Sequence, residues 1–475
     1  MGKESPSIYE KVPVIDAGAR GKAVARAGDL VIFVPYAAPG DVADLKIIRR
    51  KRSYLEARAV HFHIYSSQRT EPFCSHFGLC GGCSWQHLAY EHQLFYKQKQ
   101  VADHFTRIGK VDIPEIEPII PSPETQYYRN KLEYTFSNRR WLTDDDMKAL
   151  QPPAGEALGF HVPYVFSKVI DIQHCYLQKD PSNAIRSAVR QFALDHGMAF
   201  YDVKNNRGLL RNLIIRTTTG DDLMVVVVFG HHDEKKSKAL LEHLAGRFPE
   251  ITSLMYVVNS KKNDVISDLD AILYKGRPYI IETMKIPETD DQVIKFKIGP
   301  VSFFQTNARQ ASRLYAKVFE FAQLTGKENV YDLYSGTGAI ANILSHHAAR
   351  VTGIEYVTAA VEDARENAAF NGIVNTDFIA GDISRLLGED FTAAYGRPDV
   401  IITDPPRAGM HKRVVRSMME MAPSRIIYIS CNPATQARDI ALMNDRYAVA
   451  RLQPVDMFPH THHVENVALL VKRNG

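Results

Sequence analysis

Short apolar runs alternate with helix-like segments through residues 301–475, and this alternation restricts the fold more than any other feature of the sequence. Five of the runs read as buried strands; they lie at 329–334, 350–357, 376–382, 399–406 and 425–433. A segment of helical composition, residues 358–372, separates two of them and ends at Gly372, a residue that suits a helix C-terminus. The pattern predicts a doubly wound, mostly parallel sheet of the α/β class. Two closing runs, 447–458 and 465–473, have no helix between them and predict an antiparallel edge.

The N-terminal part carries a different β pattern. Short runs separated by Gly, Pro and Asp turns predict a small closed β-barrel of the kind that binds nucleic acid; they lie at 21–27, 29–35, 41–50 and 54–63. Apolar residues at near-helical spacing predict a helix over 88–108; they are Leu88, Leu94, Val101 and Phe105. Strand-like runs mixed with turns predict a central α+β region; they include 131–136, 213–219 and 223–229. We therefore divide the chain into three predicted domains, at 1–67, 68–300 and 301–475.

The composition is that of a globular protein with several cores, since the 475 residues are 45% apolar and 24% charged. No apolar stretch suits a signal peptide or a membrane span, so we expect a cytoplasmic protein. The net charge is only +4, but basic residues gather in one stretch against a single acid, Glu56; they are Lys46, Arg49, Arg50, Lys51, Arg52 and Arg58. Such a stretch is either a solvated surface or a binding surface for phosphates.

Ligands of a doubly wound sheet bind beyond the carboxyl ends of its strands, so the residues at those ends are candidates for a site. The first strand ends in Asp332 and runs into a glycine turn at Gly336 and Gly338. NAD binds at such turns, but Asp332 favours S-adenosylmethionine, because a carboxylate attracts its amino and sulfonium cations and opposes a pyrophosphate. Glu355 ends the second strand, where it suits the ribose hydroxyls of either ligand.

The third and fourth strands end in Asp382 and in the loop Asp404-Pro405-Pro406-Arg407. Prolines stiffen the backbone where a flat nucleobase has to be positioned. The fifth strand ends at Cys431. A lone cysteine is commonly a buried structural residue, but the place of this one, at a strand end beside the Asp404 loop, favours a catalytic thiol.

One reaction that needs such a thiol is methylation of uracil at carbon 5. That carbon is a poor nucleophile until a thiolate adds to carbon 6 and converts the ring into an enolate. After methyl transfer, a general base must remove the proton from carbon 5 before the thiol leaves. Glu465, in the loop before the last strand, is the candidate base; the alternative is a surface carboxylate on an edge strand. His460, His462 and His463 are further candidates as proton acceptors or phosphate contacts.

The remaining four cysteines form a second pattern. Cys74, Cys80 and Cys83 have the spacing C-x5-C-x2-C, and Cys175 stands apart. The odd total of five argues against a disulfide framework. By itself the pair Cys80 and Cys83 suits a redox pair or half of a zinc site, and four thiolates bind zinc as well as an iron-sulfur cluster.

Five motifs occur in order in the C-terminal part: FFQTN (303–307), DLYSGTG (332–338), DPPRAG (404–409), SCNPATQARD (430–439) and DMFPHTHHVE (456–465). With them the chain resembles the RNA uracil-5-methyltransferases. The N-terminal barrel resembles a TRAM domain, and the cysteine pattern resembles the iron-sulfur site of the subgroup that methylates 23S rRNA. The resemblance implies a Rossmann-like S-adenosylmethionine methyltransferase domain behind an OB-like TRAM barrel and a central α+β domain.

The resemblance also implies roles for individual residues. Cys431 would be the nucleophile and Glu465 the base. The cofactor contacts would come from Gln305, Tyr334, Glu355 and Asp382, beside the Asp332 and Gly336 of the glycine turn, with Asp404 near both cofactor and uracil. The family pattern favours a [4Fe-4S] cluster over zinc, held by Cys74, Cys80, Cys83 and Cys175, with a bracing role.

The expected substrate is a uridine of 23S rRNA, single-stranded or flipped out so that the thiol can reach carbon 6. A tRNA uridine is the nearest alternative. A cytosine-5-methyltransferase fits less well, because Asp404-Pro405-Pro406 stands where those enzymes tend to place a cysteine. From another class, a non-catalytic RNA-binding or ribosome assembly factor is the alternative. No membrane and no obligate protein partner is indicated.

Overall fold

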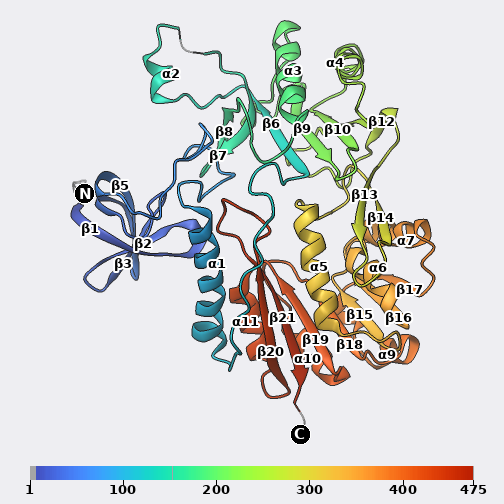
Figure 1. Cartoon of the computed structure of the whole chain (residues 1–475). Coiled ribbons are helices and arrows are strands. Elements are labelled where there is room, and N and C mark those ends of the chain that lie inside the picture. The colour runs from blue at the N-terminus through green and yellow to red at the C-terminus, as the bar shows by residue number, and fades with distance from the viewer. Residues whose placement is uncertain (1–6, 152, 474–475) are drawn as a thin grey trace.

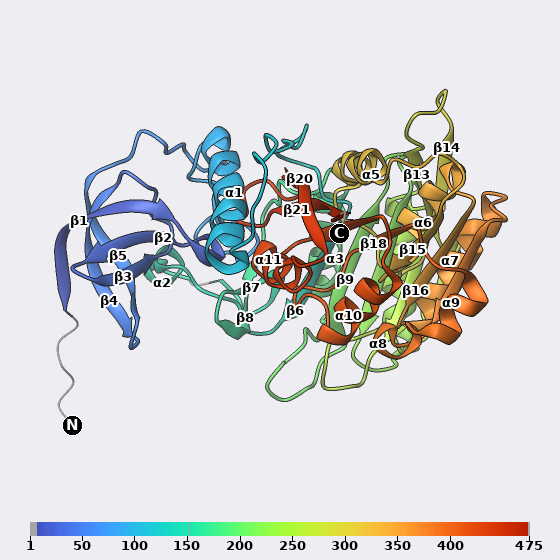
Figure 2. The ribbon, with the colours of Figure 1, turned by 90° about the horizontal axis from the view of Figure 1, so that it is seen from below.

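The computed structural model describes residues 7–151 and 153–473. Its sheets form three units in chain order: an N-terminal barrel, a central sheet and a C-terminal sheet (Figure 1). The long helix α1, Tyr90–His104, stands between the barrel and the C-terminal sheet in two perpendicular views (Figures 1 and 2). It continues into a short π-helix at Phe105–Gly109, so the predicted helix over 88–108 is confirmed. None of the helices in the described part of the chain is long and apolar enough to cross a membrane.

The barrel is closed, with the strand order β1-β2-β3-β5-β4. Its strands are β1 Ile8–Ala17, β2 Ala23–Ala27, β3 Leu30–Val34, β4 Val42–Arg50 and β5 Tyr54–Ile64, and a short 3-10 turn spans Ala19–Gly21. Alternate side chains such as Val14, Ile32 and Leu45 fill the interior, as the two-residue period of a strand requires. The sequence patterns did not single out β1, because the register of β1 against β4 shifts near Lys11, whose φ of 50° breaks the alternation.

The central sheet has seven strands in the order β12-β11-β10-β9-β6-β7-β8. They are β6 Lys131–Ser137, β7 Ala157–Val162, β8 Val165–Asp171, β9 Leu210–Thr217, β10 Leu223–Phe229, β11 Ser253–Val258 and β12 Ile272–Gly276. β10 is apolar throughout because it lies inside the sheet, parallel to β11 and antiparallel to β9, and every residue of it is buried. The helices are α2 Asp144–Lys148, α3 Ser182–Asp195 and α4 Glu234–Arg247.

The C-terminal sheet has the order β17-β16-β15-β18-β19-β21-β20. Its strands are β15 Asn329–Leu333, β16 Arg350–Glu355, β17 Thr376–Ala380, β18 Val400–Thr403, β19 Arg425–Ser430, β20 Tyr447–Val455 and β21 Glu465–Lys472. The first five are parallel, while β21 is antiparallel to β19 and to β20. This is the predicted doubly wound sheet with an antiparallel edge.

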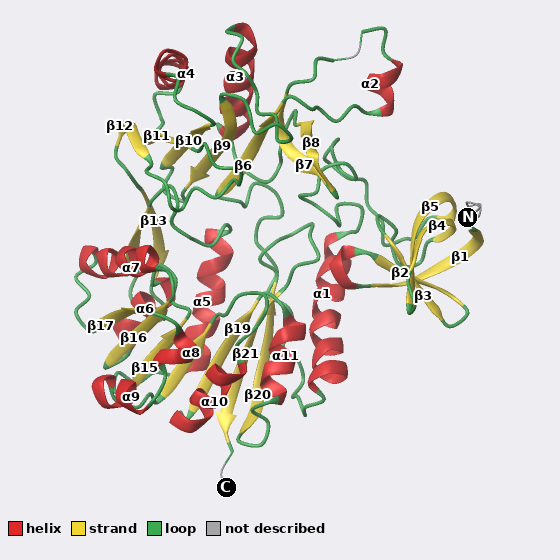
Figure 3. Cartoon of the chain, turned by 180° about the vertical axis from the view of Figure 1, so that it is seen from behind, coloured by secondary structure: helices red, strands yellow, loops and turns green. Residues whose placement is uncertain are grey.

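Helices cover both faces of this sheet (Figure 3). They are α5 Ala308–Ala322, α6 Ala339–Leu344, α7 Thr358–Phe370, α8 Ile383–Leu386, α9 Glu389–Tyr395, α10 Lys412–Met421 and α11 Pro433–Ala441, with a 3-10 turn at Ser345–His347. Apolar side chains of α5, α6 and α7 share one core with the sheet, and those of α1, α10 and α11 share another. The hairpin of β13 Ile280–Lys285 and β14 Val293–Ile298 contributes to the first core. The predicted domain limits at 67 and 300 stay predictions.

Candidate active site

The parallel register brings the predicted site residues to one edge of the sheet. Leu333, the last residue of β15, is level with Ile354 of β16 and with Thr403 of β18. Thr403 in turn is level with Tyr428 of β19. The side chains predicted from the strand ends therefore meet along this edge; they are Asp332, Glu355, Asp382, Asp404 and Cys431.

The turn after β15 has a backbone that few residues adopt. Tyr334, Gly336 and Gly338 have φ values of 64°, 53° and 75°, in the left-handed region. A Cβ on Gly338 would lie 2.8 Å from the Phe378 ring, so glycine is required there. The Gly336 amide donates to Glu355 Oε2 at 3.1 Å, and the Val357 amide donates to Glu355 Oε1 at 2.9 Å. These bonds hold the Glu355 carboxylate beside the glycine turn.

Three carboxyl groups are crowded at the centre of the edge. Asp332 is 1% exposed; its Oδ2 accepts from the Ala341 amide at 3.1 Å, and its buried Oδ1 has no partner among the described residues. Burial, with the charge of Asp404, raises the pKa of Asp332 to about 8. Burial raises the pKa of Asp404 to about 7, and burial with the charge of Asp404 raises the pKa of Glu465 to about 8. An uncompensated group of this kind attracts a cation.

Cys431 lies between the end of β19 and the start of α11, whose first turn is capped by Asn432. Burial raises the pKa of the Cys431 thiol to about 11; Glu465 and Asp404 add to the rise, and the Arg407 guanidinium opposes it. The thiol is half-buried and so keeps contact with the surface. Arg407 follows the two prolines of the fourth-strand loop and is the cation that favours the thiolate.

Glu465 is the first residue of β21 rather than part of a loop, which corrects the sequence-based interpretation. Ser430 of β19 pairs with Asn466 of β21 in an antiparallel register. The next residue outward on each strand is Cys431 and Glu465, so the ladder itself places the candidate base beside the candidate nucleophile. Glu465 is 7% exposed.

The other predicted cofactor residues lie around this centre. Gln305 precedes α5, and its carbonyl accepts from Asn130 Nδ2 at 2.9 Å. Asp382 caps α8, where its carboxylate accepts from the Ser384 amide at 2.9 Å and hydroxyl at 2.7 Å, contacts that lower its pKa. Burial raises the pKa of Tyr334 to about 12, with Asp439 and Asp382 adding to the rise.

Tyr315 of α5 was missed from the sequence. Burial raises its pKa, and Asp404 and Asp332 add to the rise, so its hydroxyl faces the carboxyl cluster. Its spacing with the buried residues of α5 made it read as core. The signal available was its polar hydroxyl among the mostly apolar buried residues of α5.

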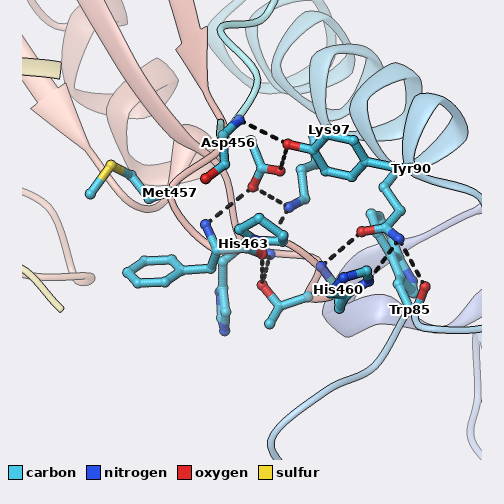
Figure 4. Close-up of polar contacts among 12 residues, drawn as sticks. Trp85, Tyr90, Lys97, Asp456, Met457, His460 and His463 are labelled. Atoms are coloured by element: carbon cyan, nitrogen blue, oxygen red, sulfur yellow. Dashed lines mark hydrogen bonds and ion pairs between the residues drawn. The ribbon is translucent and has the colours of Figure 1, made fainter. Parts of the chain in front are cut away.

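The three histidines before Glu465 are partly or fully enclosed by other residues, and their predicted roles as proton acceptors or phosphate contacts stay predictions. Burial lowers the pKa of His460 and His462 to about 4 and that of His463 to about 3, so all three are neutral at pH 7. The His460 carbonyl accepts from the amides of Ser84 and Trp85, each at 2.9 Å. His460 is therefore held in a structural network (Figure 4).

The other four cysteines line one cavity of about 550 Å³, together with Arg129 and Lys131. Burial raises the pKa of all four thiols, that of Cys80 and Cys175 to about 12 and that of Cys83 to about 11, and at these three, neighbouring thiols add to the rise. The Cys175 amide donates to Asn183 Oδ1 at 2.7 Å. Within residues 7–151 and 153–473, no group of three or more His, Cys, Asp or Glu side chains is arranged to hold a metal ion. The structure thus gathers the four thiols around one space but does not draw them onto one metal position.

Comparison with known proteins assigns the chain to a family. The model of the family described as tRNA (uracil-5-)-methyltransferase matches residues 214–473. An uncharacterized RNA methyltransferase of Bacteroides thetaiotaomicron is 54% identical over 459 residues, which cover 96% of this chain and 100% of that relative. The chain belongs to the RNA uracil-5-methyltransferase family. A relative from Chlorobaculum tepidum, also an uncharacterized RNA methyltransferase, is 40% identical and covers 91% of this chain and 89% of its own.

A solved structure extends the likeness over nearly the whole chain. The tRNA (uracil-54, C5)-methyltransferase of Pyrococcus abyssi, in complex with S-adenosyl-L-homocysteine, has a TM-score of 0.74 and 27% identity. The match covers 97% of this chain and 100% of that one. The fold is therefore that of the S-adenosylmethionine-dependent methyltransferases, preceded by a barrel consistent with an OB-like domain, as the sequence predicts.

Proposed function

We propose that this protein transfers a methyl group from S-adenosylmethionine to carbon 5 of a uridine in RNA, with Cys431 as nucleophile and Glu465 as base. One observation carries the proposal: the β19–β21 register puts these two residues side by side at the edge where the glycine turn and the Asp404 loop end. Family membership supports the reaction class.

The steps follow from the chemistry of the two side chains. The Cys431 thiolate adds to carbon 6, forming a carbon–sulfur bond and an enolate whose carbon 5 takes the methyl group from the sulfonium. Glu465 then accepts the proton from carbon 5, the electron pair reforms the ring double bond, and the carbon–sulfur bond breaks to release the thiolate. The positive charge of Arg407 stabilises the Cys431 thiolate before it adds to carbon 6 and again after it is released in the last step.

The residues of the site fit a cationic methyl donor. The unpartnered Oδ1 of Asp332 and the raised pKa values of Asp332, Asp404 and Glu465 describe a pocket of crowded acids whose ionised forms repel one another. S-adenosylmethionine supplies the methyl group and brings a sulfonium and an amino cation, which relieve this repulsion. Glu355 would accept the ribose hydroxyls, and Gln305, Tyr334 and Asp382 would complete the pocket.

The class of RNA that carries the target uridine is a separate part of the proposal. We propose a uridine of 23S rRNA, supported by the four-cysteine cavity and by the basic tip of the barrel, where Arg49, Arg50, Lys51 and Arg52 are all exposed. A tRNA uridine is the second candidate, favoured by the whole-chain likeness to the Pyrococcus abyssi enzyme.

We further propose that Cys74, Cys80, Cys83 and Cys175 hold a [4Fe-4S] cluster. The donor set fits, because four thiols line one cavity, and burial, with a smaller effect from neighbouring thiols, favours their protonated form until a cation binds. The cluster would brace the cysteine-rich segment against the central sheet and would take part in no step of the methyl transfer.

RNA that carries 5-fluorouridine tests the chemistry, because the base cannot remove fluorine and the adduct is trapped. We expect a covalent protein–RNA complex that requires S-adenosylmethionine, and its loss in Cys431→Ala along with a fall in methylation of at least about 10³-fold. With ordinary RNA, Glu465→Gln should accumulate adduct and turn over about 10²- to 10⁴-fold more slowly. Separate assays with 23S rRNA fragments and with tRNA decide the substrate. An undiminished adduct in Cys431→Ala rules out the nucleophile, and no adduct with any RNA favours a non-catalytic RNA-binding factor.

A further inference from the structure

The nine residues that lead into Glu465, 456–464, form a segment that three other parts of the chain hold by polar contacts. We call this stretch the approach segment. Helix α1 provides one set of contacts (Figure 4), residues 84 and 85 after the cysteine motif provide the second, and the core provides the third. The core contacts are a 3.0 Å bond from Asn307 Nδ2 to the Met457 carbonyl and a 3.0 Å bond from the Tyr128 hydroxyl to the Pro459 carbonyl.

An ion pair begins the approach segment. The side chains of Lys97 and Asp456 are both 0% exposed, and Lys97 Nζ lies 2.5 Å from Asp456 Oδ1. Lys97 Nζ also donates to the Phe458 carbonyl at 3.0 Å, while Asp456 Oδ1 accepts from the Phe458 amide at 3.1 Å. The hydroxyl of Tyr90 donates to Asp456 Oδ2 at 2.8 Å. One lysine thus fixes both ends of the turn at 456–458 relative to α1.

A second α1 side chain fixes the middle of the segment. Gln93 Oε1 accepts from the His460 amide at 2.8 Å, and its Nε2 donates to the carbonyls of Leu88 at 2.7 Å and Trp85 at 3.1 Å. His460 has a φ of 63°, which is uncommon for a residue other than glycine and persists only where surrounding bonds impose it. The approach segment therefore has one permitted path from β20 to Glu465.

The Lys97–Asp456 ion pair is better explained as a device that fixes the angle of the turn at 456–458 than as a source of stability for the fold. Removing two charges from water costs about as much as their attraction returns, so an apolar pair of the same size would stabilise the fold equally well. An apolar pair would not, however, fix the angle of the turn. Glu465 receives its position from the β21 ladder on one side and from the approach segment on the other, and a shift on the order of 1 Å at a reacting group is enough to slow a step about 10²-fold.

We propose that Lys97 and Asp456 are positioning residues for the proton removal by Glu465, the second half of the reaction. This inference rests on the proposed function. It assigns a role to a fully buried ion pair between α1 and the segment that follows β20. It also separates the two halves of the reaction, because Cys431 directly follows β19 and leads into α11, so its place does not depend on the approach segment.

The test measures formation and breakdown of the adduct separately, by rapid quenching of the reaction with ordinary uridine RNA. The variant is Lys97→Met with Asp456→Asn, which removes both charges and leaves neither unpaired. We expect adduct formation within about threefold of the wild-type rate and release on the order of 10- to 100-fold slower, so that adduct accumulates. The matched control is Lys99→Met with Asp103→Asn on the same helix, a part-exposed ion pair at 2.8 Å whose other partners are Asp16 and Arg107 and not the approach segment. It should match the wild type in both steps.

Several outcomes separate the inference from the proposed function. Equal slowing of both steps, or of neither, overturns the positioning role. If Glu465→Gln accumulates adduct and the double variant does not, only the positioning role fails; if Glu465→Gln accumulates none, the assignment of the base fails. Should the double variant not fold, Tyr90→Phe decides, because it removes one bond to Asp456 and strands no charge. If Tyr90→Phe slows release of the adduct roughly 2- to 10-fold and leaves its formation unchanged, the positioning role is supported. If the ratio of the two rates stays at the wild-type value, the positioning role is overturned.

Discussion

The carboxyl cluster at the sheet edge and the thiol cluster beside the central sheet are built on the same electrostatic principle. Each crowds several acids of one type in a buried space, so that burial and mutual repulsion raise their pKa values. Each would ionise fully only when a positive group arrives. Under the proposed assignments they differ in permanence, because S-adenosylmethionine would enter and leave in every cycle, whereas an iron-sulfur cluster would stay.

The residues around the two clusters match the proposed difference in the permanence of their ligands. Glu355 is held by two backbone amides and Asp332 by one, while Asp332 Oδ1 is left open, so the carboxyl pocket is shaped in advance of its ligand. The thiols line a cavity of about 550 Å³ in which no metal position is formed among the described residues. A permanent ligand can itself shape its site, whereas an exchanging ligand needs a site that exists without it.

The largest effect is expected from Cys175→Ser. Removing one of four thiolates should eliminate most of the bound iron and destabilise the fold by about 4 kcal/mol or more, because metal binding and folding are coupled. Iron content and the visible absorption of anaerobically purified protein measure the first, and thermal unfolding measures the second. Cys431→Ser is the matched control and should keep its iron while losing methylation. Protein loaded with zinc from iron-replete cells contradicts the proposed cluster.

Asp332→Asn should produce the next largest effect. Replacing the carboxylate removes the partner of a cation and should weaken S-adenosylmethionine binding by about 1.5–3 kcal/mol, or on the order of 10- to 100-fold. S-adenosylhomocysteine, whose sulfur is uncharged, should lose less. Isothermal titration with both ligands measures the difference. Equal losses would mean that Asp332 does not recognise the sulfonium.

The pH dependence of the same residue gives an independent check. Burial raises the pKa of Asp332 to about 8 in the fold from its ordinary value of 3.8, so the folded protein binds the proton more tightly than the unfolded chain does. The ligand-free protein should therefore lose stability as the pH rises between these two values, and Asp332→Asn should lose less. Affinity for S-adenosylmethionine should rise over the same range, because the carboxylate form binds the cation. Thermal unfolding from pH 5 to pH 9, with and without ligand, tests both signs.

The sequence predicted much of the carboxyl site because a doubly wound sheet converts chain order into spatial order. Asp332, Glu355, Asp404 and Cys431 lie at successive strand ends, and parallel strands bring those ends to one edge. No knowledge of side-chain packing was needed for that step.

What the sequence did not reveal depends on contacts between distant parts of the chain. Tyr315 follows the apolar period of α5 and differs from a core residue only in what its hydroxyl meets. Lys97 and Asp456 are 359 positions apart, and nothing local marks a lysine on α1 as fully buried. Both residues owe their surroundings to tertiary packing, which periodicity does not encode.

The smallest effect is expected at the barrel. The charged residues at its tip are positive and exposed to solvent, unlike the buried acids of the carboxyl and thiol clusters. Arg50 and Arg52 are exposed at the tip between β4 and β5, so each would bind one phosphate of single-stranded RNA without desolvation. Counterion release predicts that Arg52→Gln weakens RNA binding about fourfold at 0.15 M salt and lowers the slope of log affinity against log salt by about 0.7. The control is Lys238→Gln on α4, an exposed cation in the central unit, which should change neither quantity. Fluorescence anisotropy across a salt series measures both. Because iron content and ligand affinity should stay at wild-type values in Arg52→Gln, a change in either would show that the barrel tip acts on the buried clusters and not on RNA alone.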